Sequence, residues 1–476
     1  MSATAVTSTP ATSATTQVRA WAGLAALVTA TFAYTVLEAW IAPALPVIQE
    51  HVHASNTSLP WVFAPMLICA AVSTTLAGRL GDLFGLRPVL LTVLSILCTG
   101  VALAAVATSI ELLAVGQAMQ GLGMGSIPLS VAILRNMFPQ SRISMAIGIY
   151  VGASAIGNAV GFILPGYVLR TLSYGWLFWL PLVVIGLSTL VAWSCLPSGS
   201  RRAGQSVDWI GALVLALGLT ALVLAITVAP ALGWLSVPTL ALFGVAVALL
   251  AGWVVIETRS RQPLIAMSLL RQKNVWLTGF ISLAIGFGIF SSMVLVPMLA
   301  ALPRVDDLGF GATTTQVGVL LLPLGAAGVL VGPMSGVLDH KIGARASVQL
   351  GMLILTIGSL GLVFMHAEQW QILVAISIIG IGVFLALTAS INLITGSVAA
   401  EDVGFAASLP LTAKSIGGSL GAQIGVSVLA SQTVVATGRP LDAGFTISFA
   451  IATIVALGGL AMSLALPNAP KVPPRQ

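Results

Sequence analysis

The stretch "GRLGDLFGLRP", residues 78–88, separates two long apolar runs and concentrates charge in a chain that has little. It carries Arg79, Asp82 and Arg87 among three glycines, whereas only 7% of the 476 residues are charged. Glycines at such a spacing are typical of a tight turn. The role of this turn depends on the solvent that surrounds the runs on either side of it.

The composition of the chain is that of a helical membrane protein. Hydrophobic residues make up 58% of it and the mean hydropathy is +1.07, whereas a soluble domain carries roughly 25% charged residues. Apolar runs of about 18 residues or more with few charges predict membrane-spanning helices. The runs are too long for the strands of an outer-membrane barrel and do not alternate. We therefore expect an all-α membrane protein.

Hydropathy predicts fourteen membrane-spanning helices, each close to the ~20 residues that cross ~30 Å of hydrocarbon. An even number of spans places both ends of the chain on the same side of the membrane. The predicted spans are 20–43, 59–78, 88–108, 112–134, 143–168, 176–197, 208–229, 236–256, 275–301, 315–338, 346–365, 370–395, 404–430 and 444–466.

The basic residues support this topology, because cytoplasmic loops are enriched in Lys and Arg. With a cytoplasmic N-terminus, fifteen of the nineteen Lys and Arg residues fall on the cytoplasmic side. Arg170, Arg304 and Arg439 fall outside, and Lys414 lies within a span. The net charge of +6 therefore follows the membrane topology and does not indicate nucleic-acid binding. Abundant alanine and arginine favour a GC-rich bacterial source. We therefore expect a multi-pass protein of the bacterial inner membrane, and the distribution of the basic residues predicts that both of its termini are cytoplasmic.

The opening stretch has a second copy, "GVLDHKIGAR" at 336–345, which lies 258 residues downstream between two later spans. Such a repeat predicts two six-helix bundles related by an axis along the membrane normal. Gly78, Leu80, Gly85 and Arg87 fall on Gly336, Leu338, Gly343 and Arg345, and His340 replaces Asp82. The expected parts are a disordered cytoplasmic tail (1–18), an N-terminal bundle (19–197), two extra membrane helices with linkers (198–273), a C-terminal bundle (274–466) and a cytoplasmic tail (467–476).

Residues 78–90, "GRLGDLFGLRPVL", resemble the signature loop of the major facilitator superfamily, Gly-x-Leu-x-Asp-x-x-Gly-x-Arg/Lys. The resemblance extends along the chain. "ALPVIQ" (44–49), "QAMQGLGMGSIPLSVAILRNMFP" (117–139) and "GNAVGFILPG" (157–166) are similar to the family's first span, fourth span and fifth-span antiporter motif. "DWIGALVLALGL" from Asp208, "GW" at 233–234 and "PLIAMSLLRQ" from Pro263 are similar to its fourteen-span drug:proton antiporter branch.

This resemblance implies the major facilitator fold and export of hydrophobic or amphipathic, often cationic, small molecules by alternating access, driven by protons. It also implies a gating role for the repeated turn. Asp82 would accept hydrogen bonds from helix N-termini and pair with an arginine, and the glycines permit close approach. The alternative is a surface turn that serves only the topology. The gating-loop candidates are Gly78, Asp82, Gly85, Arg87, His340 and Arg345, and those of the antiporter motif are Gly157, Gly161, Pro165 and Gly166.

The sequence departs from the family pattern at two polar positions. The family's fourth-span arginine, three residues before the Gln-Gly pair, is Gln117 here. The family's first-span acid, nine residues before the final proline, falls on Leu37, and the acid is Glu38. Because one residue rotates a side chain by ~100° around a helix, Glu38 is expected to face a different direction from the family's acid.

Glu38 and Lys414 are the charges most clearly placed within hydrocarbon, where a charge costs several kcal/mol and function is the default hypothesis. Burial favours the neutral form of a carboxyl group, so Glu38 suits reversible protonation. Tyr34 lies one turn away on the same face and is expected to orient it. The alternative is that Glu38 reaches water at the outer end of its helix.

Lys414 is followed by Gly417, Gly421 and Gly425, which form a small-residue stripe on one helix face. This pattern favours a latch between the two halves over direct contact with a substrate or a purely structural role. We therefore assign Glu38 and Lys414 to proton coupling. The expected substrate cavity comprises Tyr34, Glu38, Gln117, Asn158 and Asn392, although such polar residues also tie helices together.

The sequence offers no enzymatic site. It has no phosphate-binding loop and no His-Glu-x-x-His, and Cys69, Cys98 and Cys195 indicate neither a disulfide framework nor a metal site. We expect no catalytic residues, no metal and no cofactor. The expected partners are a hydrophobic or amphipathic small molecule, protons and membrane lipid, with the chain as a monomer. The alternatives are transport of a lipid-like molecule or proton-linked import of a metabolite.

Overall fold

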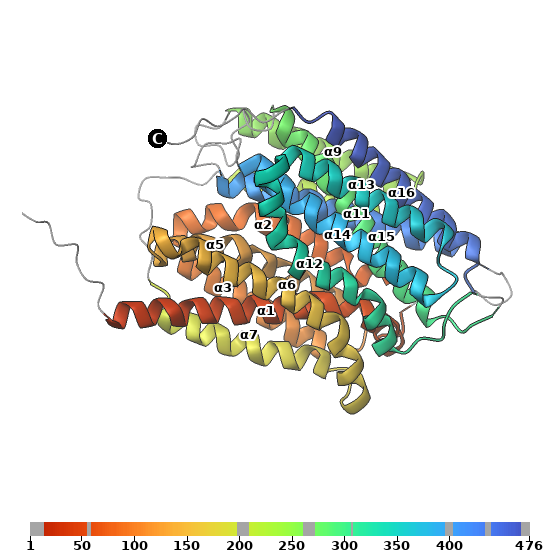
Figure 1. The fold of residues 1–476 in the computed structure, drawn as a ribbon, viewed down its shortest axis with the longest axis horizontal. Helices are drawn as coiled ribbons and strands as arrows, with labels where there is room; N and C mark the ends of the chain where they lie inside the picture. The colour runs from red at the N-terminus through yellow and green to blue at the C-terminus, as the bar shows by residue number, and fades with distance from the viewer. Residues whose placement is uncertain are drawn as a thin grey trace, which may run out of the picture.

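The computed structural model describes residues 14–54, 59–197, 209–259, 272–305, 308–395, 403–433 and 439–467. Within these ranges the chain forms helices, and the extended pairings are two isolated bridges. Figure 1 shows the helices side by side along the long axis, with α1 (Ala14–His51) beginning at its left-hand end. The last helix is α16 (Asp442–Leu464).

The helices form two halves and an additional pair. The N-terminal half contains α1, η1 (Leu59–Val62), α2 (Ala64–Phe84), α3 (Leu86–Ala105), α4 (Ile110–Leu122), η2 (Gly123–Gly125), α5 (Ser126–Met137), α6 (Gln140–Thr171) and α7 (Trp176–Cys195). The additional pair is α8 (Trp209–Leu232) and α9 (Val237–Arg259). The C-terminal half contains α11 (Lys273–Ala301), α12 (Thr314–Ile342), α13 (Ala344–Phe364), α14 (Gln369–Thr395), α15 (Val403–Ser431) and α16.

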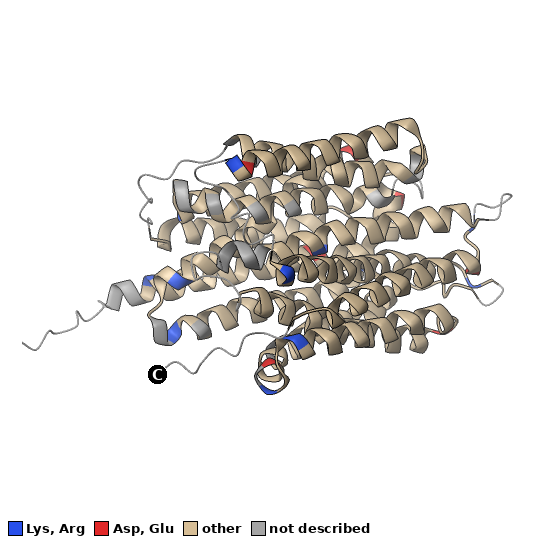
Figure 2. Cartoon of the chain, turned by 90° about the horizontal axis from the view of Figure 1, so that it is seen from above, with Lys and Arg blue, Asp and Glu red and all other residues tan. Residues whose placement is uncertain are grey.

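These helices confirm the all-α membrane class. A helical segment lies on each predicted span, and ten helices in the described part of the chain are long and apolar enough to cross a membrane. Figure 2 shows how few charged residues the helices carry along their length. The division into the five predicted parts stays a prediction.

Two helices differ from the predicted spans. α1 continues to His51, well beyond the predicted end at residue 43, and contains Pro43 and Pro46. Proline is tolerated within membrane helices because neighbouring helices satisfy the freed carbonyls. The predicted span 112–134 is interrupted by the 3₁₀ turn η2, whose glycines allow α2 and α3 to approach closely.

The two copies of the repeated turn have the same backbone. Gly85 joins α2 to α3 with φ 97° and ψ 139°, and Gly343 joins α12 to α13 with φ 89° and ψ 146°. A side chain is strained at such a positive φ. The sequence repeat is therefore a structural repeat, and it requires glycine at these two positions.

A second repeated feature is the packing of a glycine-bearing helix on the first helix of each half. Gly157 and Gly161 of α6 lie against the backbone of α1, while Gly417 and Gly421 of α15 lie against that of α11. At each position an added Cβ would overlap a carbonyl oxygen of the neighbouring helix. Thus α6 and α15 occupy equivalent places, as do α1 and α11, and the offset from α6 to α15 is 260 residues.

The additional pair packs on one side of the junction between the halves. Leu215 and Leu219 of α8 form an apolar cluster with Trp253 of α9. Val72 of α2 and Ile416 of α15 pack against this cluster. The pair therefore contacts both halves at the place where α2 meets α15.

Two arginines that were predicted to break the positive-inside pattern connect loops at one end of the C-terminal half. Arg304 forms an ion pair with Glu368 (Nη2–Oε1 3.0 Å). Arg439 donates to the carbonyls of Pro303, Val305 and Leu308, each at 3.1 Å. These contacts connect the loops that follow α11, α13 and α15.

Capping residues precede the first turns of α4 and α12. Ser109 Oγ accepts a hydrogen bond from the Leu112 amide at the start of α4, and Thr313 and Gln316 form a capping box at the start of α12. Hydrogen bonds from its own backbone and from Ser109 hold the pKa of Glu111 below its usual range. A negative charge in the first turn also suits the helix dipole.

Candidate functional site

Glu38 of α1 and Lys414 of α15 lie close enough across the two halves to interact electrostatically. Both side chains are half-buried at positions remote from the helix ends. Glu38 forms no hydrogen bond within the described structure. The two charges that the sequence placed in hydrocarbon therefore form one site, to which each half contributes one member.

Glu38 lies far from the C-terminal end of its own helix. Thirteen residues separate it from His51, the last residue of α1, which corresponds to about 20 Å at a rise of ~1.5 Å per residue. A glutamate side chain is far too short to reach the end of the helix.

Equivalent positions in the two halves differ in chemistry. The glycine contacts place Phe32 and Val36 of α1 in register with Leu283 and Phe287 of α11. The register that pairs Phe32 with Leu283 and Val36 with Phe287 makes Ile289 the counterpart of Glu38. Likewise, the offset from α6 to α15 makes Ser154 the counterpart of Lys414.

All four of these side chains are half-buried: Glu38, Ile289, Ser154 and Lys414. The charged members come from opposite halves, and so do the uncharged ones. The scaffold is therefore repeated, whereas the ionisable chemistry is not.

Tyr34 lies beside Glu38 and interacts with it electrostatically. Its side chain is buried and its hydroxyl has no hydrogen-bond partner in the described structure. The predicted proximity to Glu38 is present, but no hydrogen bond joins the two groups. The hydroxyl thus remains a donor for another group in the interior.

Two further cavity candidates lie in the N-terminal half. Gln117 of α4 is 0% exposed, and neither end of its amide has a hydrogen-bond partner among the described residues. Asn158 of α6 is half-buried and donates to the Ser154 carbonyl at 3.1 Å. No described contact joins either residue to Glu38. A buried amide without a partner is costly, so Gln117 is the stronger candidate for binding a polar group.

The structure places Asn392 away from this site. It is exposed and lies three residues before the end of α14. Its Nδ2 donates to Asp339 Oδ2 of α12 at 2.7 Å. The predicted span covers this position, but the residue lies too close to the helix end to reach the depth of Glu38. Asn392 connects two helix ends of the C-terminal half and is not part of the cavity.

The arginines of the repeated turn bind within their own halves. Arg87 Nη2 donates to the carbonyl of Trp193 near the end of α7, and Arg345 Nη2 donates to that of Leu464, the last residue of α16, at 3.0 Å. Terminal carbonyls of a helix lack partners within the helix. Each arginine therefore fastens the last helix of its half to the repeated turn.

The remaining gating candidates are only partly described. The side chains of Asp82 and His340 lie outside the described residues. Gly78 and Gly336 have open space where a Cβ would be. The gating role of these residues stays a prediction.

The antiporter-motif residues of α6 face two different helices. Gly157 and Gly161 contact α1 of the same half, whereas Gly166 meets Thr315 at the start of α12 in the other half. Pro165 lies within α6, which continues to Thr171. The motif thus reaches both halves.

The glycines that follow Lys414 do not form the expected stripe between the halves. Gly417 and Gly421 pack on α11 within the C-terminal half, and Gly425 approaches Leu295 of the same helix. Close packing holds α15 to its own half. Lys414 itself interacts electrostatically with Glu38 of the other half.

Gln423 is a second unpartnered buried amide, and the predicted cavity does not include it. It is 0% exposed in α15, and both of its amide atoms lack partners. The sequence carries a signal for it, because glutamine is rare in an apolar span. It was not predicted as a cavity residue because it lies on a different face of its helix from Lys414.

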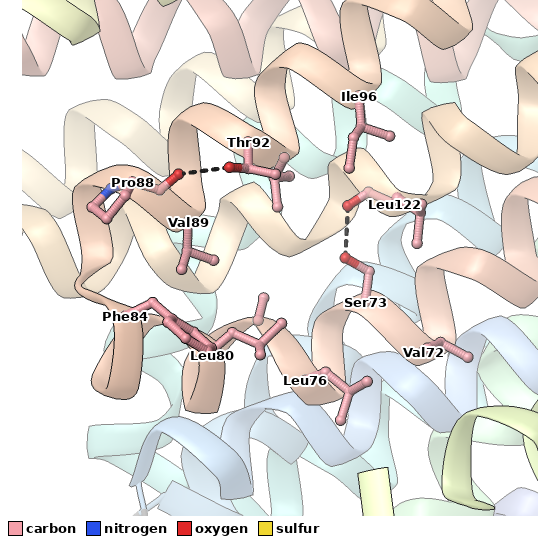
Figure 3. Close-up of a pocket in the computed structure, with 12 residues that line it drawn as sticks. Val72, Ser73, Leu76, Leu80, Phe84, Pro88, Val89, Thr92, Ile96 and Leu122 are labelled. Carbon is pink, nitrogen blue, oxygen red and sulfur yellow. Dashed lines mark hydrogen bonds between the residues drawn. The ribbon is translucent and has the colours of Figure 1, made fainter. Parts of the chain in front are cut away.

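A separate apolar cavity of about 370 Å³ lies between α2 and α3, beside the first copy of the turn. Figure 3 shows Leu76, Leu80 and Phe84 on one wall and Val89 and Ile96 on the other. Its polar side chains, Ser73 and Thr92, are engaged with backbone carbonyls. With no charged side chain in its lining, it is distinct from the Glu38 and Lys414 site.

The described residues contain no group of His, Cys, Asp and Glu side chains that could hold a metal ion. The cysteines in this part of the chain are free. What the site offers is one carboxyl group, one ammonium group and several hydrogen-bonding side chains. Such a set can bind a cation or exchange a proton.

Comparison with known families settles the wider classification, because the model of the Major Facilitator Superfamily matches residues 27–422. The chain belongs to this superfamily. The resemblance stated from residues 78–90 is therefore confirmed, and the chain is a multi-pass membrane protein.

Curated relatives of this superfamily are export and resistance proteins. The chain is 28% identical over 419 residues to the tetracenomycin C resistance and export protein of Streptomyces glaucescens, covering 87% of this chain and 77% of the relative. It is 29% identical over 393 residues to the multidrug resistance protein Stp of Mycobacterium tuberculosis (strain CDC 1551 / Oshkosh), covering 82% and 72%. It is 22% identical over 369 residues to the multidrug transporter protein MdtP of Bacillus subtilis (strain 168), covering 76% and 67%.

Solved structures of other transporters share the fold. A POT-family peptide transporter in an autoinhibited form superposes with a TM-score of 0.68 at 16% identity, covering 95% of this chain and 99% of its own. A point mutant of the nucleoside transporter NupG gives a TM-score of 0.67 at 12% identity, covering 93% and 99%. The major facilitator fold is therefore confirmed.

Proposed function

We propose that the chain exports hydrophobic or amphipathic small molecules across the bacterial inner membrane, in exchange for protons, by alternating access. The similarity to export and multidrug resistance proteins supports the direction and the kind of cargo. The observation that carries the proposal is the electrostatic interaction of Glu38 with Lys414, which belong to different halves. Ionisable residues inside a membrane protein mark ion and proton pathways.

In this mechanism the proton and the cargo compete for Glu38. A deprotonated carboxylate attracts Lys414 and also a cationic cargo, because unit charges a few Å apart interact strongly at low dielectric. A proton on Glu38 removes both attractions. Since Glu38 and Lys414 belong to different halves, protonation also changes the force between the halves, which biases the equilibrium between two conformations.

The uncharged polar groups near this site would orient the cargo. Tyr34 has a free hydroxyl, and Gln117 has an amide without a partner. Both supply hydrogen bonds that a polar group of the cargo satisfies on entering. The apolar counterpart position Ile289 offers a surface for the hydrophobic part of the cargo.

The repeated turns would keep each half rigid during the cycle. Arg87 and Arg345 fasten the last helix of each half to the turn between its second and third helices. For Asp82 we propose a gating role, in which Asp82→Asn lowers turnover more than substrate binding. A defect confined to affinity would contradict that role.

We further propose fourteen membrane crossings, cytoplasmic termini and a monomer. The distribution of Lys and Arg along the sequence and the helix on each predicted span support this topology. Reporter fusions at residues 140 and 270 should both report the cytoplasmic face. Opposite faces would refute the fourteen-span arrangement.

Transport in proteoliposomes with an imposed pH gradient tests the function. The wild-type protein should accumulate a lipophilic cation such as tetraphenylphosphonium against its gradient on the side from which the protons come. Glu38→Gln should abolish this accumulation. Normal gradient-driven transport by Glu38→Gln would remove Glu38 from the mechanism, and movement of labelled phospholipid alone would favour the lipid-transporter alternative.

A further inference from the structure

The halves meet along two lateral seams that the internal repeat makes equivalent. One seam is formed by α2 and α15, and the other by α12 and α6. α2 corresponds to α12 through the repeated turn, with an offset of 258 residues, and α6 corresponds to α15 through the glycine contacts, with an offset of 260. A transporter of perfect repeat symmetry would open both seams alike.

The α2/α15 seam is closed and covered. Thr74 Oγ1 and Thr412 Oγ1 lie 3.4 Å apart across it. The apolar cluster of Leu215, Leu219 and Trp253 packs against both of its helices from the membrane side. The loop after α8 adds a hydrogen bond from Trp234 Nε1 to Ser427 Oγ of α15 at 3.4 Å.

The α6/α12 seam is closed only in its outer half. Gly166 of α6 meets Thr315, and Gly318 and Gly325 of α12 meet Phe162 and Ala159 of α6. At each of these glycines an added Cβ would overlap the opposite helix. In this region the two helices pack at backbone distance, as small residues permit.

The same faces of both helices carry glycines further toward the cytoplasm. Gly152 and Gly148 lie seven and eleven residues before Ala159, and Gly332 and Gly336 lie seven and eleven residues after Gly325. Seven and eleven residues correspond to rotations of about 700° and 1100°, within about 20° of whole turns. All four glycines have nothing within 4 Å of an added Cβ. Both faces thus have the same small residues along their length, but they touch only in the outer half.

The repeat permits a comparison at one matched position. The offsets map Thr74 onto Gly332 and Thr412 onto Gly152. These residues lie about 14–18 Å from the cytoplasmic ends of their helices, at ~1.5 Å per residue. At this depth the covered seam is in contact, whereas the uncovered seam has open space.

We infer that the molecule opens toward the cytoplasm on one side only: the inner halves of α6 and α12 separate and close, while α8 holds the α2/α15 seam together. The glycines at 148, 152, 332 and 336 are the packing surface of the closed state. The additional helix pair thereby breaks the symmetry of the repeat. The inference rests on the alternating access of the proposed function: two constant distances would count against both, whereas equal changes at both seams would refute this inference alone.

Two matched cysteine pairs test this inference, in full-length protein whose three native cysteines are replaced by serine. Gly152→Cys with Gly332→Cys reports the α6/α12 seam, and Thr74→Cys with Thr412→Cys reports the α2/α15 seam. Spin-label distances are measured in proteoliposomes at acidic and alkaline pH, with and without tetraphenylphosphonium. The distance at the α6/α12 pair should change between conditions, and that at the α2/α15 pair should stay constant. Equal changes at both pairs, a change at α2/α15 alone, or two constant distances would overturn the inference.

Disulfide formation in the same variants provides the functional readout. The α2/α15 pair should crosslink under all conditions and leave transport largely intact. Crosslinking of the α6/α12 pair should vary severalfold between conditions and block transport reversibly. Loss of transport on crosslinking α2/α15 alone would contradict the inference.

A bulky residue on the glycine face provides a test without cysteines. Gly332→Leu should prevent inner closure, so it should lower turnover severalfold while the outer half of the seam remains packed. The matched control is Gly244→Leu in α9, a helical glycine that also has nothing within 4 Å of an added Cβ. Equal effects of the two substitutions would show that the glycine face has no special role.

Discussion

The two halves of this protein share their scaffold but differ in their charges. Each has a turn with a glycine at positive φ, an arginine that binds the end of the last helix, and a glycine-bearing helix packed on the first helix. Yet the position occupied by Glu38 in one half is Ile289 in the other, and Lys414 corresponds to Ser154. Repetition therefore supplies the moving framework, and the departure from repetition supplies the coupling chemistry.

The additional pair α8 and α9 is a second departure of the same kind. It covers one of two equivalent seams and leaves the other uncovered. The chemistry and the motion are thus both asymmetric within a symmetric framework. The following predictions test this comparison, beginning with the largest expected effect.

The largest effect on transport should come from replacing the carboxyl group of Glu38, whose equivalent position in the other half is Ile289. Glu38→Gln should lower the initial rate of gradient-driven transport on the order of 100-fold, because proton pathways in membranes depend on ionisable groups. Ile289→Ala is the matched control and should reduce the rate only a few-fold. Comparable losses in both variants, measured in proteoliposomes, would show that the asymmetry is not functional.

Replacing Lys414 by the residue at the equivalent position of the N-terminal half should slow transport but strengthen cation binding. Lys414→Ser introduces the residue found at the equivalent position. It should lower the transport rate roughly tenfold and tighten tetraphenylphosphonium binding several-fold, since Glu38 loses a competing cation. Equilibrium binding and transport are measured on the same preparation, and weaker binding of the cation would contradict this assignment.

Removing either arginine anchor should destabilise the protein equally. Arg87→Ala and Arg345→Ala each remove a hydrogen bond from a charged donor, worth about 1.5–3 kcal/mol when buried and less at these half-buried sites. The thermal midpoint in detergent should fall by a similar amount in both variants, with cation affinity unchanged. A loss in only one variant would show that the two copies of the turn are not equivalent.

The glycines of the turns should give the smallest paired effect. Gly85→Ala and Gly343→Ala should each cost about 1–3 kcal/mol, because a side chain is strained at positive φ. Gly78→Ala and Gly336→Ala are matched controls, since they lie in helices with open space around them. They should be neutral or slightly stabilising, as alanine favours the helix. Thermal midpoints of all four variants decide the comparison.

The fold was predictable because its determinants are local or periodic. Apolar runs separated by charged turns predict the spans, and the repeated turn predicts the two halves. The extension of α1 to His51 was missed because Pro43 and Pro46 predict a helix end in water, whereas neighbouring helices support proline in a membrane bundle.

The candidate site was predictable only in part. Charges within apolar runs identified Glu38 and Lys414, but their contact joins helices that lie far apart in the sequence. Polarity alone did not distinguish Asn392, which connects two helix ends, from Gln117, which is buried without a partner. Likewise, small-residue spacing located the packing face of Gly417 and Gly421, but not the helix on which it packs.

Proton release on cargo binding tests the central claim most directly. Purified protein in weakly buffered detergent solution is mixed with tetraphenylphosphonium near neutral pH, and the released protons are counted with a pH indicator. The account predicts about one proton per bound cation for the wild-type protein and none for Glu38→Gln. Undiminished release by Glu38→Gln would show that protons and cargo do not compete for this carboxyl group.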